Sequence, residues 1–143
     1  MTALRLLLDT NVLLDLLLAR APFDSAAVGL ATKTAQGEVV TYLSATSVTT
    51  VHYLARKALG RDGANQAVGR LLELFRVAPI TDIVLRSALA RNFADFEDAV
   101  IDAAAEHVGV DAIVTRDAAG FRASSIPVFS PPEVLQAIAA RGH

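Results

Sequence analysis

The chain contains no cysteine, and this absence excludes disulfide bonds, cysteine-ligated metals and cysteine nucleophiles. A net charge of strongly positive sign is also missing, because 13 basic and 15 acidic residues give a formal charge of −2. A chain with this balance has no global positive field that would attract a phosphate backbone. The lack of cysteine fits a reducing compartment, and we expect a cytoplasmic protein.

Targeting and membrane segments are missing as well. The amino-terminal stretch lacks a charged region, an apolar core and a small-residue cleavage site in that order, so we expect no secretory signal. Asp9 and Asp15 interrupt the strongly apolar run at this end, which argues against a membrane span. No repeat, low-complexity segment or linker divides the 143 residues, so we predict a single domain over residues 1–143.

Several catalytic fingerprints are absent too. The glycines form neither a P-loop nor a dinucleotide-binding motif, which weakens the hypothesis of a small Rossmann-like nucleotide-binding protein. No serine, histidine and aspartate arrangement can be argued. His52 lies between Val51 and Tyr53, and packing or surface exposure explains it better than catalysis.

An apolar-rich composition, 53% hydrophobic, is what the chain does have, and it is typical of a compact globular fold. The run Leu6-Leu7-Leu8 leads directly into Asp9, and a second apolar run follows Thr10-Asn11. This pattern predicts a buried strand, a turn at Thr10-Asn11, and a helix from near Val12. The functional crevice of an open α/β sheet lies at the carboxyl ends of its strands, so Asp9 is a candidate for chemistry.

β-branched runs alternate with helical segments along the rest of the chain. Strands are predicted at residues 4–8, 38–43, 76–80, 110–115 and 126–129. Helices are predicted at residues 12–19, 24–35, 44–59, 62–75, 81–92 and 95–108, and another is opened by Pro131-Pro132. Gly60 is expected to end the third helix and Asp62 to cap the fourth. This alternation predicts the α/β class with a parallel sheet.

Three acids stand at related places in this pattern. Asp9 and Asp117 each follow a predicted strand, and Asp98 lies in the first turn of the helix before the later strand. Strand-end acids of a parallel sheet share one edge, so Asp9 and Asp117 can converge. Converging carboxylates repel one another unless a cation sits between them, and Mg²⁺ and Mn²⁺ prefer oxygen ligands. The alternatives are local: each acid could instead cap or complement a helix or turn.

Other charged residues have simpler expected roles. Asp95, Asp98, Asp102 and Glu106 share one helical side, which is typical of a solvated face. Asp15 is expected to face solvent or an arginine.

Two groups of basic residues could contact phosphate. Arg20 and Arg116 lie next to the proposed pocket in sequence, and Arg56, Lys57 and Arg61 cluster near a helix end. For the second group, a solvated helix face is an equal explanation.

Four segments resemble, in order and spacing, motifs of the PIN domain. They are Leu7-Leu8-Asp9-Thr10-Asn11-Val12-Leu13-Leu14-Asp15, Ser44-Ala45-Thr46-Ser47, Asp95-Phe96-Glu97-Asp98-Ala99 and Val114-Thr115-Arg116-Asp117. Arg20-Ala21-Pro22-Phe23 is similar to the bacterial branch of small stand-alone PIN proteins.

The resemblance implies a Rossmann-like three-layer α/β/α sandwich with a central parallel sheet of four to five strands. It implies Mg²⁺ or Mn²⁺ held by Asp9, Asp98 and Asp117, with Glu97 assisting catalysis. Endonuclease cleavage of RNA is the implied activity, in many cases by the toxin of a toxin–antitoxin pair. Thr10, Asn11, Ser44, Arg20 and Arg116 are the residues we assign to the substrate side.

Two positions depart from the family pattern. Thr50 stands where many PIN nucleases carry a glutamate, and Gly120 stands where an acid is common before the phenylalanine.

Two hypotheses for the function follow from the acids, the resemblance and these departures. The first is a metal-dependent ribonuclease that leaves a 5′-phosphate and a 3′-hydroxyl. The second is a non-catalytic PIN-like module that binds RNA or a protein partner. We also expect a homodimer, because a small domain rich in alanine and leucine often buries a face in self-association.

Overall fold

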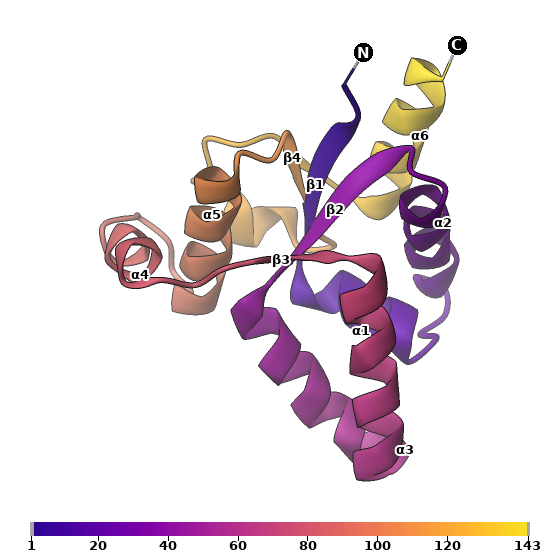
Figure 1. Ribbon diagram of the computed structural model, residues 1–143. Helices are drawn as coiled ribbons and strands as arrows, with labels where there is room; N and C mark the ends of the chain where they lie inside the picture. Colours follow the sequence, from indigo (N-terminus) through magenta and orange to yellow (C-terminus); the bar gives the residue numbers. More distant parts are fainter. Residues whose placement is uncertain (1, 143) are drawn as a thin grey trace.

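A five-stranded parallel sheet forms the centre of the molecule, in a computed structural model that describes residues 2–142. The strands are β1 (Leu4–Leu8), β2 (Val39–Ser44), β3 (Arg76–Ala78), β4 (Ala112–Val114) and β5 (Val128–Phe129), in the order β3-β2-β1-β4-β5. Every neighbouring pair is parallel (Figure 1). The predicted α/β class and central parallel sheet are therefore confirmed.

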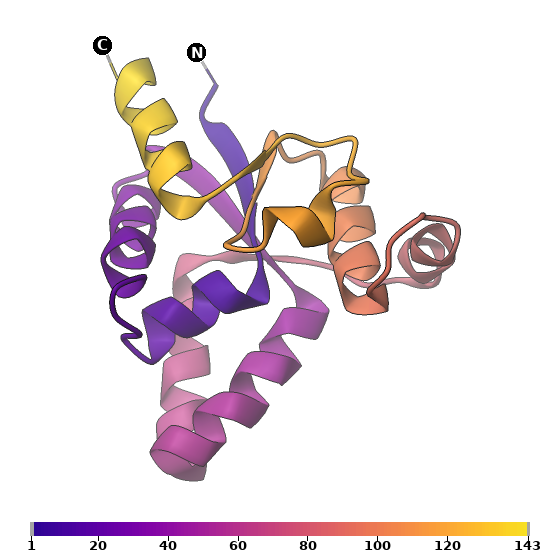
Figure 2. The same cartoon turned by 180° about the vertical axis from the view of Figure 1, so that it is seen from behind.

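Helices cover both faces of this sheet. They are α1 (Thr10–Leu17), α2 (Asp24–Ala35), α3 (Ala45–Leu74), α4 (Asp82–Leu89), α5 (Phe96–Val108) and α6 (Pro131–Arg141), with a short 3₁₀ helix η1 (Ala118–Phe121) after β4. Figures 1 and 2 show α4 and α5 on one side of the sheet and α1, α2, α3 and α6 on the other. The three-layer sandwich is therefore confirmed.

The leucine run of β1 explains how the layers are held together. Leu6 and Leu8 belong to the hydrophobic core shared with α1, α2, α3 and α6, whereas Leu7 belongs to the core shared with α4 and α5. Successive side chains of a strand point to opposite faces, so an uninterrupted apolar run is needed where both faces are buried.

Two predicted details are wrong at helix ends. Thr10 and Asn11 do not form a turn, because Asp9 accepts a hydrogen bond from the Thr10 amide and α1 begins directly at Thr10. Asp62 does not cap a separate helix, because it lies within α3, where the helix resumes after Gly60.

Gly60 does interrupt α3, as predicted. Its φ of 75° and ψ of 174° are non-helical, and a positive φ is readily adopted only by glycine. The two arms of α3 fold back as a hairpin (Figure 1), and His52 Nε2 lies 2.6 Å from Asn65 Oδ1 across it. This contact explains His52 without catalysis.

The order of the strands sets the position of the functional crevice. The chain runs from β1 outward to β2 and β3, and then returns to the opposite side of β1 for β4 and β5. The boundary between β1 and β4 is therefore the topological switch point, where open α/β sheets bind ligands. No helix in residues 2–142 combines the length and apolarity needed to cross a membrane.

Candidate active site

Asp9 lies at the switch point with both carboxylate oxygens hydrogen-bonded. Its backbone amide donates to the Val114 carbonyl at 2.9 Å, which holds the ends of β1 and β4 together. Oδ1 accepts from the Thr10 amide at 2.8 Å, and Oδ2 accepts from Thr115 Oγ1 at 2.7 Å and Asn11 Nδ2 at 3.2 Å. Asp9 thus caps α1, which is one of the two roles predicted for it, and it does so at the switch point, where its role as a site residue stays a prediction.

Thr115 is a site residue that the sequence analysis did not single out. Its hydroxyl donates to Asp9 and accepts from the Asp117 amide at 2.9 Å. One buried hydroxyl therefore positions the acid after β1 and the backbone of the acid after β4. A small β-branched residue two positions before the second acid was the only available signal.

Asp98 and Asp117 approach one another across Gly120. Asp117 Oδ1 accepts from the Gly120 amide at 3.3 Å and caps η1, and Asp98 stands in the first turn of α5. A Cβ atom added to Gly120 would lie 2.8 Å from Asp117 Oδ2 and 2.9 Å from Asp98 Oδ2. Glycine therefore leaves both carboxylates in their present positions, whereas a larger residue would displace at least one of them.

The acids share one strongly negative environment. Burial, followed by the negative charges of Asp9, Asp95, Asp117 and Glu97, raises the pKa of Asp98 to about 7. Burial is also the main cause of the raised pKa of Asp9, and the charges of Asp117 and Asp95 add to it. Hydrogen bonds from Thr115 and Thr10 oppose this rise. The carboxylates of Asp9, Asp98 and Asp117 therefore lie close enough for their charges to interact, which agrees with the predicted convergence.

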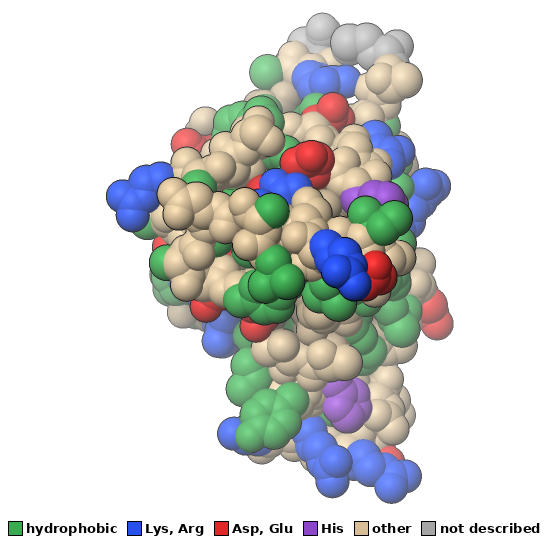
Figure 3. Space-filling view, turned by 90° about the vertical axis from the view of Figure 1, so that its left-hand side faces the viewer, with side chains coloured by type: hydrophobic (Ala, Val, Ile, Leu, Met, Phe, Trp, Pro, Cys, Tyr) green, Lys and Arg blue, Asp and Glu red, His purple; other side chains and the backbone are tan. Residues whose placement is uncertain are grey.

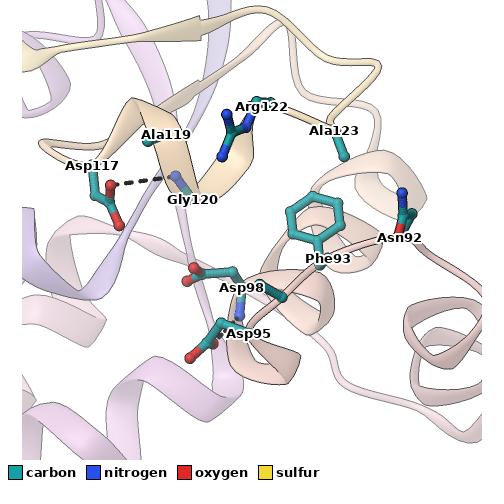
Figure 4. A pocket seen from close by; sticks show the side chains of 10 residues that line it. Asn92, Phe93, Asp95, Asp98, Asp117, Ala119, Gly120, Arg122 and Ala123 are labelled. Carbon is teal, nitrogen blue, oxygen red and sulfur yellow. Dashed lines mark hydrogen bonds between the residues drawn. The ribbon is translucent and has the colours of Figure 1, made fainter.

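Three of these acids, Asp95, Asp98 and Asp117, line a pocket of about 640 Å³. Figure 4 shows Asp95, Asp98 and Asp117 on one side of it and Phe93 and Asn92 on the other. The remaining lining residues are Ala94, Ala119, Gly120, Arg122 and Ala123. The pocket is thus acidic on one side, and the opposite side combines Phe93 with the polar residue Asn92.

The chemistry of this donor set fits a hard divalent cation. All its donors are carboxylate oxygens, and within residues 2–142 none of the acids Asp9, Asp95, Glu97, Asp98 and Asp117 forms an ion pair. The charge of a bound Mg²⁺ or Mn²⁺ would relieve the repulsion that raises the pKa values. The described residues contain no ready-made group of three acid or histidine ligands, so the carboxylates must close further around an ion.

Glu97 reaches the site from a different direction. Thr10 Oγ1 lies 2.8 Å from Ser47 Oγ and 3.4 Å from Glu97 Oε1. An acid from α5 therefore stands beside the first turns of α1 and α3. Thr50, at the position of the missing glutamate, turns its hydroxyl back toward the Thr46 carbonyl at 3.4 Å. No site role was predicted from the sequence for Ser47, which is buried.

Ser44 is placed differently from the predicted substrate side. It is fully buried, and its hydroxyl accepts from the Thr46 amide at 3.2 Å as the N-cap of α3. The assignment to substrate contact is therefore corrected. Ser44 has no exposed surface with which to contact a substrate, and its oxygen accepts a hydrogen bond from a helix amide that has no partner within the helix.

Arg20 and Arg116 both bind Asp15. Arg20 Nε lies 3.0 Å from Asp15 Oδ1, while Arg116 places Nε 2.6 Å from Oδ2 and Nη2 3.2 Å from Oδ1. Asp15 is only 1% exposed, so the expectation that it faces solvent is wrong and the expectation of an arginine partner is confirmed.

Asp102 corrects the expected solvated face of α5. Its side chain is fully buried, it binds Arg91 Nη1 at 2.7 Å, and it accepts a hydrogen bond from Ser124. Glu106, one turn later, is exposed and binds Arg91 Nη2 at 2.9 Å. The reason is that α4 and α5 pack together, so Arg91 at the end of α4 covers this side of α5.

The other basic cluster lies at the tip of the α3 hairpin. Arg56, Lys57 and Arg61 are exposed there, and Lys57 Nζ stands 4.5 Å from the centre of the exposed Tyr53 ring. Figure 3 shows basic side chains gathered at this lower end of the molecule. The first turn of α3 borders the acidic site, so the tip is separated from it by an arm of the hairpin.

The fold is a parallel α/β/α sandwich, and its candidate site is a group of acids at the topological switch point. A PIN domain family model matches residues 5–119, and the chain belongs to this family. No protein of curated function matches the sequence at a significant level.

Several solved structures have a similar fold. VapBC2 of Rickettsia felis, bound to a DNA fragment from its promoter, is 11% identical with a TM-score of 0.67 and covers 87% of this chain and 97% of its own. A toxin–antitoxin complex from Klebsiella pneumoniae is 22% identical with a TM-score of 0.64, covering 91% and 98%. VapC20 of Mycobacterium tuberculosis, a Sarcin-Ricin loop cleaving toxin, is 21% identical with a TM-score of 0.60, covering 76% and 86%. At these identities the similarity establishes the fold.

Proposed function

We propose that this protein is a divalent-metal-dependent endoribonuclease that acts as the toxin of a toxin–antitoxin pair. The observation that carries the proposal is the convergence of Asp9, Asp98 and Asp117 at the switch point, where burial, followed by repulsion from the neighbouring acids, raises the pKa of Asp98 to about 7. Membership in the PIN domain family supports it.

Asp9, Asp98 and Asp117 would hold Mg²⁺ or Mn²⁺. When bound, such an ion supplies an activated water and neutralises charge that develops on a phosphodiester. Asp9 is oriented for this by Thr115 and Asn11, and Asp98, whose pKa is raised to about 7, would have to be ionised to act as a ligand. Glu97 assists from beside Thr10.

RNA and an antitoxin are the proposed partners. VapC20 is a Sarcin-Ricin loop cleaving toxin, and the Klebsiella pneumoniae structure is a toxin–antitoxin complex, which supports both partners. We further propose a homodimer, supported by the exposed apolar side chains Ile83, Leu85 and Leu89 on α4. Figure 3 shows hydrophobic side chains on this face of the molecule. Light scattering that finds a monomer at high concentration contradicts the dimer.

The test is cleavage of generic RNA by the purified protein with Mg²⁺ or Mn²⁺. Asp9→Asn, Asp98→Asn and Asp117→Asn should each lower the rate by about 100-fold or more, because each removes a charge from the ion's surroundings. Asp82→Asn is the matched control, since Asp82 is an exposed acid on α4 paired with Arg86. Undiminished cleavage by Asp9→Asn contradicts the assignment.

A non-catalytic PIN-like module is the second candidate. Thr50 and Gly120 in place of acids favour it, as does the lack of a ready-made three-ligand group within residues 2–142. This candidate predicts RNA or protein binding without cleavage, and no rise in melting temperature on adding Mn²⁺.

A further inference from the structure

A second charged centre lies directly beside the acidic pocket and carries the opposite excess of charge. The buried carboxylate of Asp15 binds the guanidinium groups of both Arg20 and Arg116, so one negative charge holds two positive charges. Arg20 is 40% exposed and Arg116 is 28% exposed, whereas Asp15 is 1% exposed. The excess positive charge is therefore exposed to solvent, and the buried carboxylate of Asp15 holds it in place.

Asn11 connects this centre to Asp9. Its side-chain amide donates to Asp9 Oδ2 at 3.2 Å, and its Oδ1 accepts from the Arg116 amide at 3.4 Å. Its backbone carbonyl accepts from Arg20 Nη2 at 3.4 Å. The two arginines are thus one residue away from the carboxylate at the centre of the candidate active site.

A pocket with an aromatic wall adjoins one of these arginines, Arg116. The Arg116 guanidinium carbon lies 3.9 Å from the centre of the Phe23 ring, and that ring is 43% exposed. The two residues line a largely apolar pocket of about 420 Å³, together with Pro22, Ala26, Ser130, Pro131 and Pro132. This volume is within the range of small-ligand pockets, roughly 300–1,000 Å³.

We propose that this centre is a nucleotide subsite for the RNA strand. Arg20 and Arg116 bind a backbone phosphate next to the cleaved one, and the Phe23 pocket receives the attached base. Asp15 is a positioning residue that acts through the arginines. The proposal rests on the proposed function, in that it takes RNA to be the strand that reaches the acidic pocket.

Charge complementarity favours a nucleotide over an apolar peptide as the occupant. A phosphate backbone approaching the acids around Asp9 is repelled, and a positive excess beside them offsets that repulsion. Asp15 accepts hydrogen bonds from Nε and Nη2 of Arg116, so other N–H groups of this guanidinium can bind a ligand. The planar arrangement of guanidinium N–H groups matches phosphate oxygens. An aromatic face stacks on any base, so the pocket needs no particular sequence.

Binding is tested without metal, so that cleavage cannot interfere. In EDTA, 5′-AMP should shift the ring resonances of Phe23, and adenosine should do so much more weakly because it lacks the phosphate. A fluorescent single-stranded RNA should bind Arg116→Gln, Arg20→Gln and Phe23→Leu at least about 10-fold more weakly than the wild type. The arginine variants should also show a shallower salt dependence, by about one unit of slope.

Controls separate this subsite from a purely structural clamp. Arg86→Gln breaks a surface Arg–Asp pair on α4 and should leave RNA binding unchanged. Arg116→Lys keeps the charge and loses the fork, so it should bind more weakly than the wild type and more tightly than Arg116→Gln. Asp15→Asn should raise KM for RNA while kcat changes little; if this variant does not fold, the Arg116 and Phe23 variants carry the test.

The outcomes distinguish failure of the subsite from failure of the nuclease. If the wild type cleaves RNA and both Arg116→Gln and Phe23→Leu keep its KM, the subsite is overturned and the nuclease stands. If no metal supports cleavage but 5′-AMP binds at Phe23, the nuclease is overturned and the nucleotide subsite is supported. If a proline-rich peptide shifts the Phe23 resonances and 5′-AMP does not, the pocket is a peptide groove and the subsite is overturned.

Discussion

Thr115 donates its hydroxyl hydrogen to Asp9 Oδ2 at 2.7 Å, across the boundary between the two strands that flank the switch point. The same oxygen accepts from the Asp117 amide, so removing it loosens two acids at once. Thr115→Val should lower metal affinity and cleavage by roughly 10- to 100-fold, the range found when groups that orient metal ligands are lost. Titration with Mn²⁺ and cleavage rates measure the two effects.

Thr115→Ser is the matched variant, because it keeps the hydroxyl and loses only a methyl group. It should retain most of the metal affinity and activity. A large loss in Thr115→Ser with little loss in Thr115→Val would show that the methyl group, and not the hydrogen bond, holds the site together.

The backbone framework of this site was predictable from the sequence because its signals are local. The run Leu6-Leu7-Leu8 before Asp9 marks a strand buried on both faces, and each acid after a parallel strand must lie at the same sheet edge. That Asp9 and Asp117 share one sheet edge followed from this rule, whereas the adjacency of β1 and β4 is set by the strand order of the fold.

Side-chain partners that join distant segments were not predictable. Asp15 and Asp102 have the same local appearance as solvated helix acids, and only the packing of other elements buries them against Arg116 and Arg91. Thr115 and Ser47 are likewise ordinary small polar residues until the fold brings them to Asp9 and Thr10. Helical spacing gives the side of a helix on which a residue lies, and it does not give what covers that side.

The raised pKa of Asp98 predicts how stability changes with pH in the absence of metal. The folded protein holds a proton on Asp98 up to about pH 7, whereas the unfolded chain releases it near its ordinary value of 3.8. The free energy of unfolding should therefore fall as the pH rises from about 4 to about 7, because the native state binds more protons in this window. Urea denaturation in EDTA at several pH values measures the change, and Asp98→Asn should flatten it.

Metal binding should show the opposite dependence on pH. An ion competes with the proton on Asp98, so Mn²⁺ should raise the melting temperature more at pH 8 than at pH 6. A stabilisation by Mn²⁺ that is the same at both pH values, or that survives in Asp98→Asn, contradicts a role for Asp98 as a ligand.

Gly120 predicts a steric effect on the same pair of acids. In Gly120→Ala the new Cβ would stand 2.8 Å from Asp117 Oδ2 and 2.9 Å from Asp98 Oδ2, so at least one carboxylate must move away. We expect metal affinity to fall by about 10-fold or more, since displaced ligands no longer close around an ion. Calorimetric titration with Mn²⁺ measures this loss.

Gly69→Ala is the control for a glycine-to-alanine change. Gly69 lies in α3 with no atom within 4 Å of an added Cβ, so this variant should keep its metal affinity and gain a little helix stability, about 1 kcal/mol at most. Unchanged affinity in Gly120→Ala would mean that Asp98 and Asp117 do not bind the ion together.

Asp102 provides the clearest contrast between an acid that supports the fold and the acids that form the site. It is fully buried, and its loss leaves the Arg91 guanidinium without its buried partner. Asp102→Ala should therefore cost about 1–3 kcal/mol of unfolding free energy, as expected when a buried hydrogen-bonded partner is lost while Glu106 still binds Arg91. Asp82→Ala, which removes the exposed partner of Arg86, should cost no more than about 1 kcal/mol.

Replacing both members of the buried pair, as in Arg91→Met with Asp102→Leu, should recover much of the loss, because no lone charge remains inside. Urea denaturation of the four proteins gives these values, and cleavage per folded molecule should stay at the wild-type level. A large loss of cleavage in folded Asp102→Ala would assign Asp102 to the acidic site and contradict this division of roles.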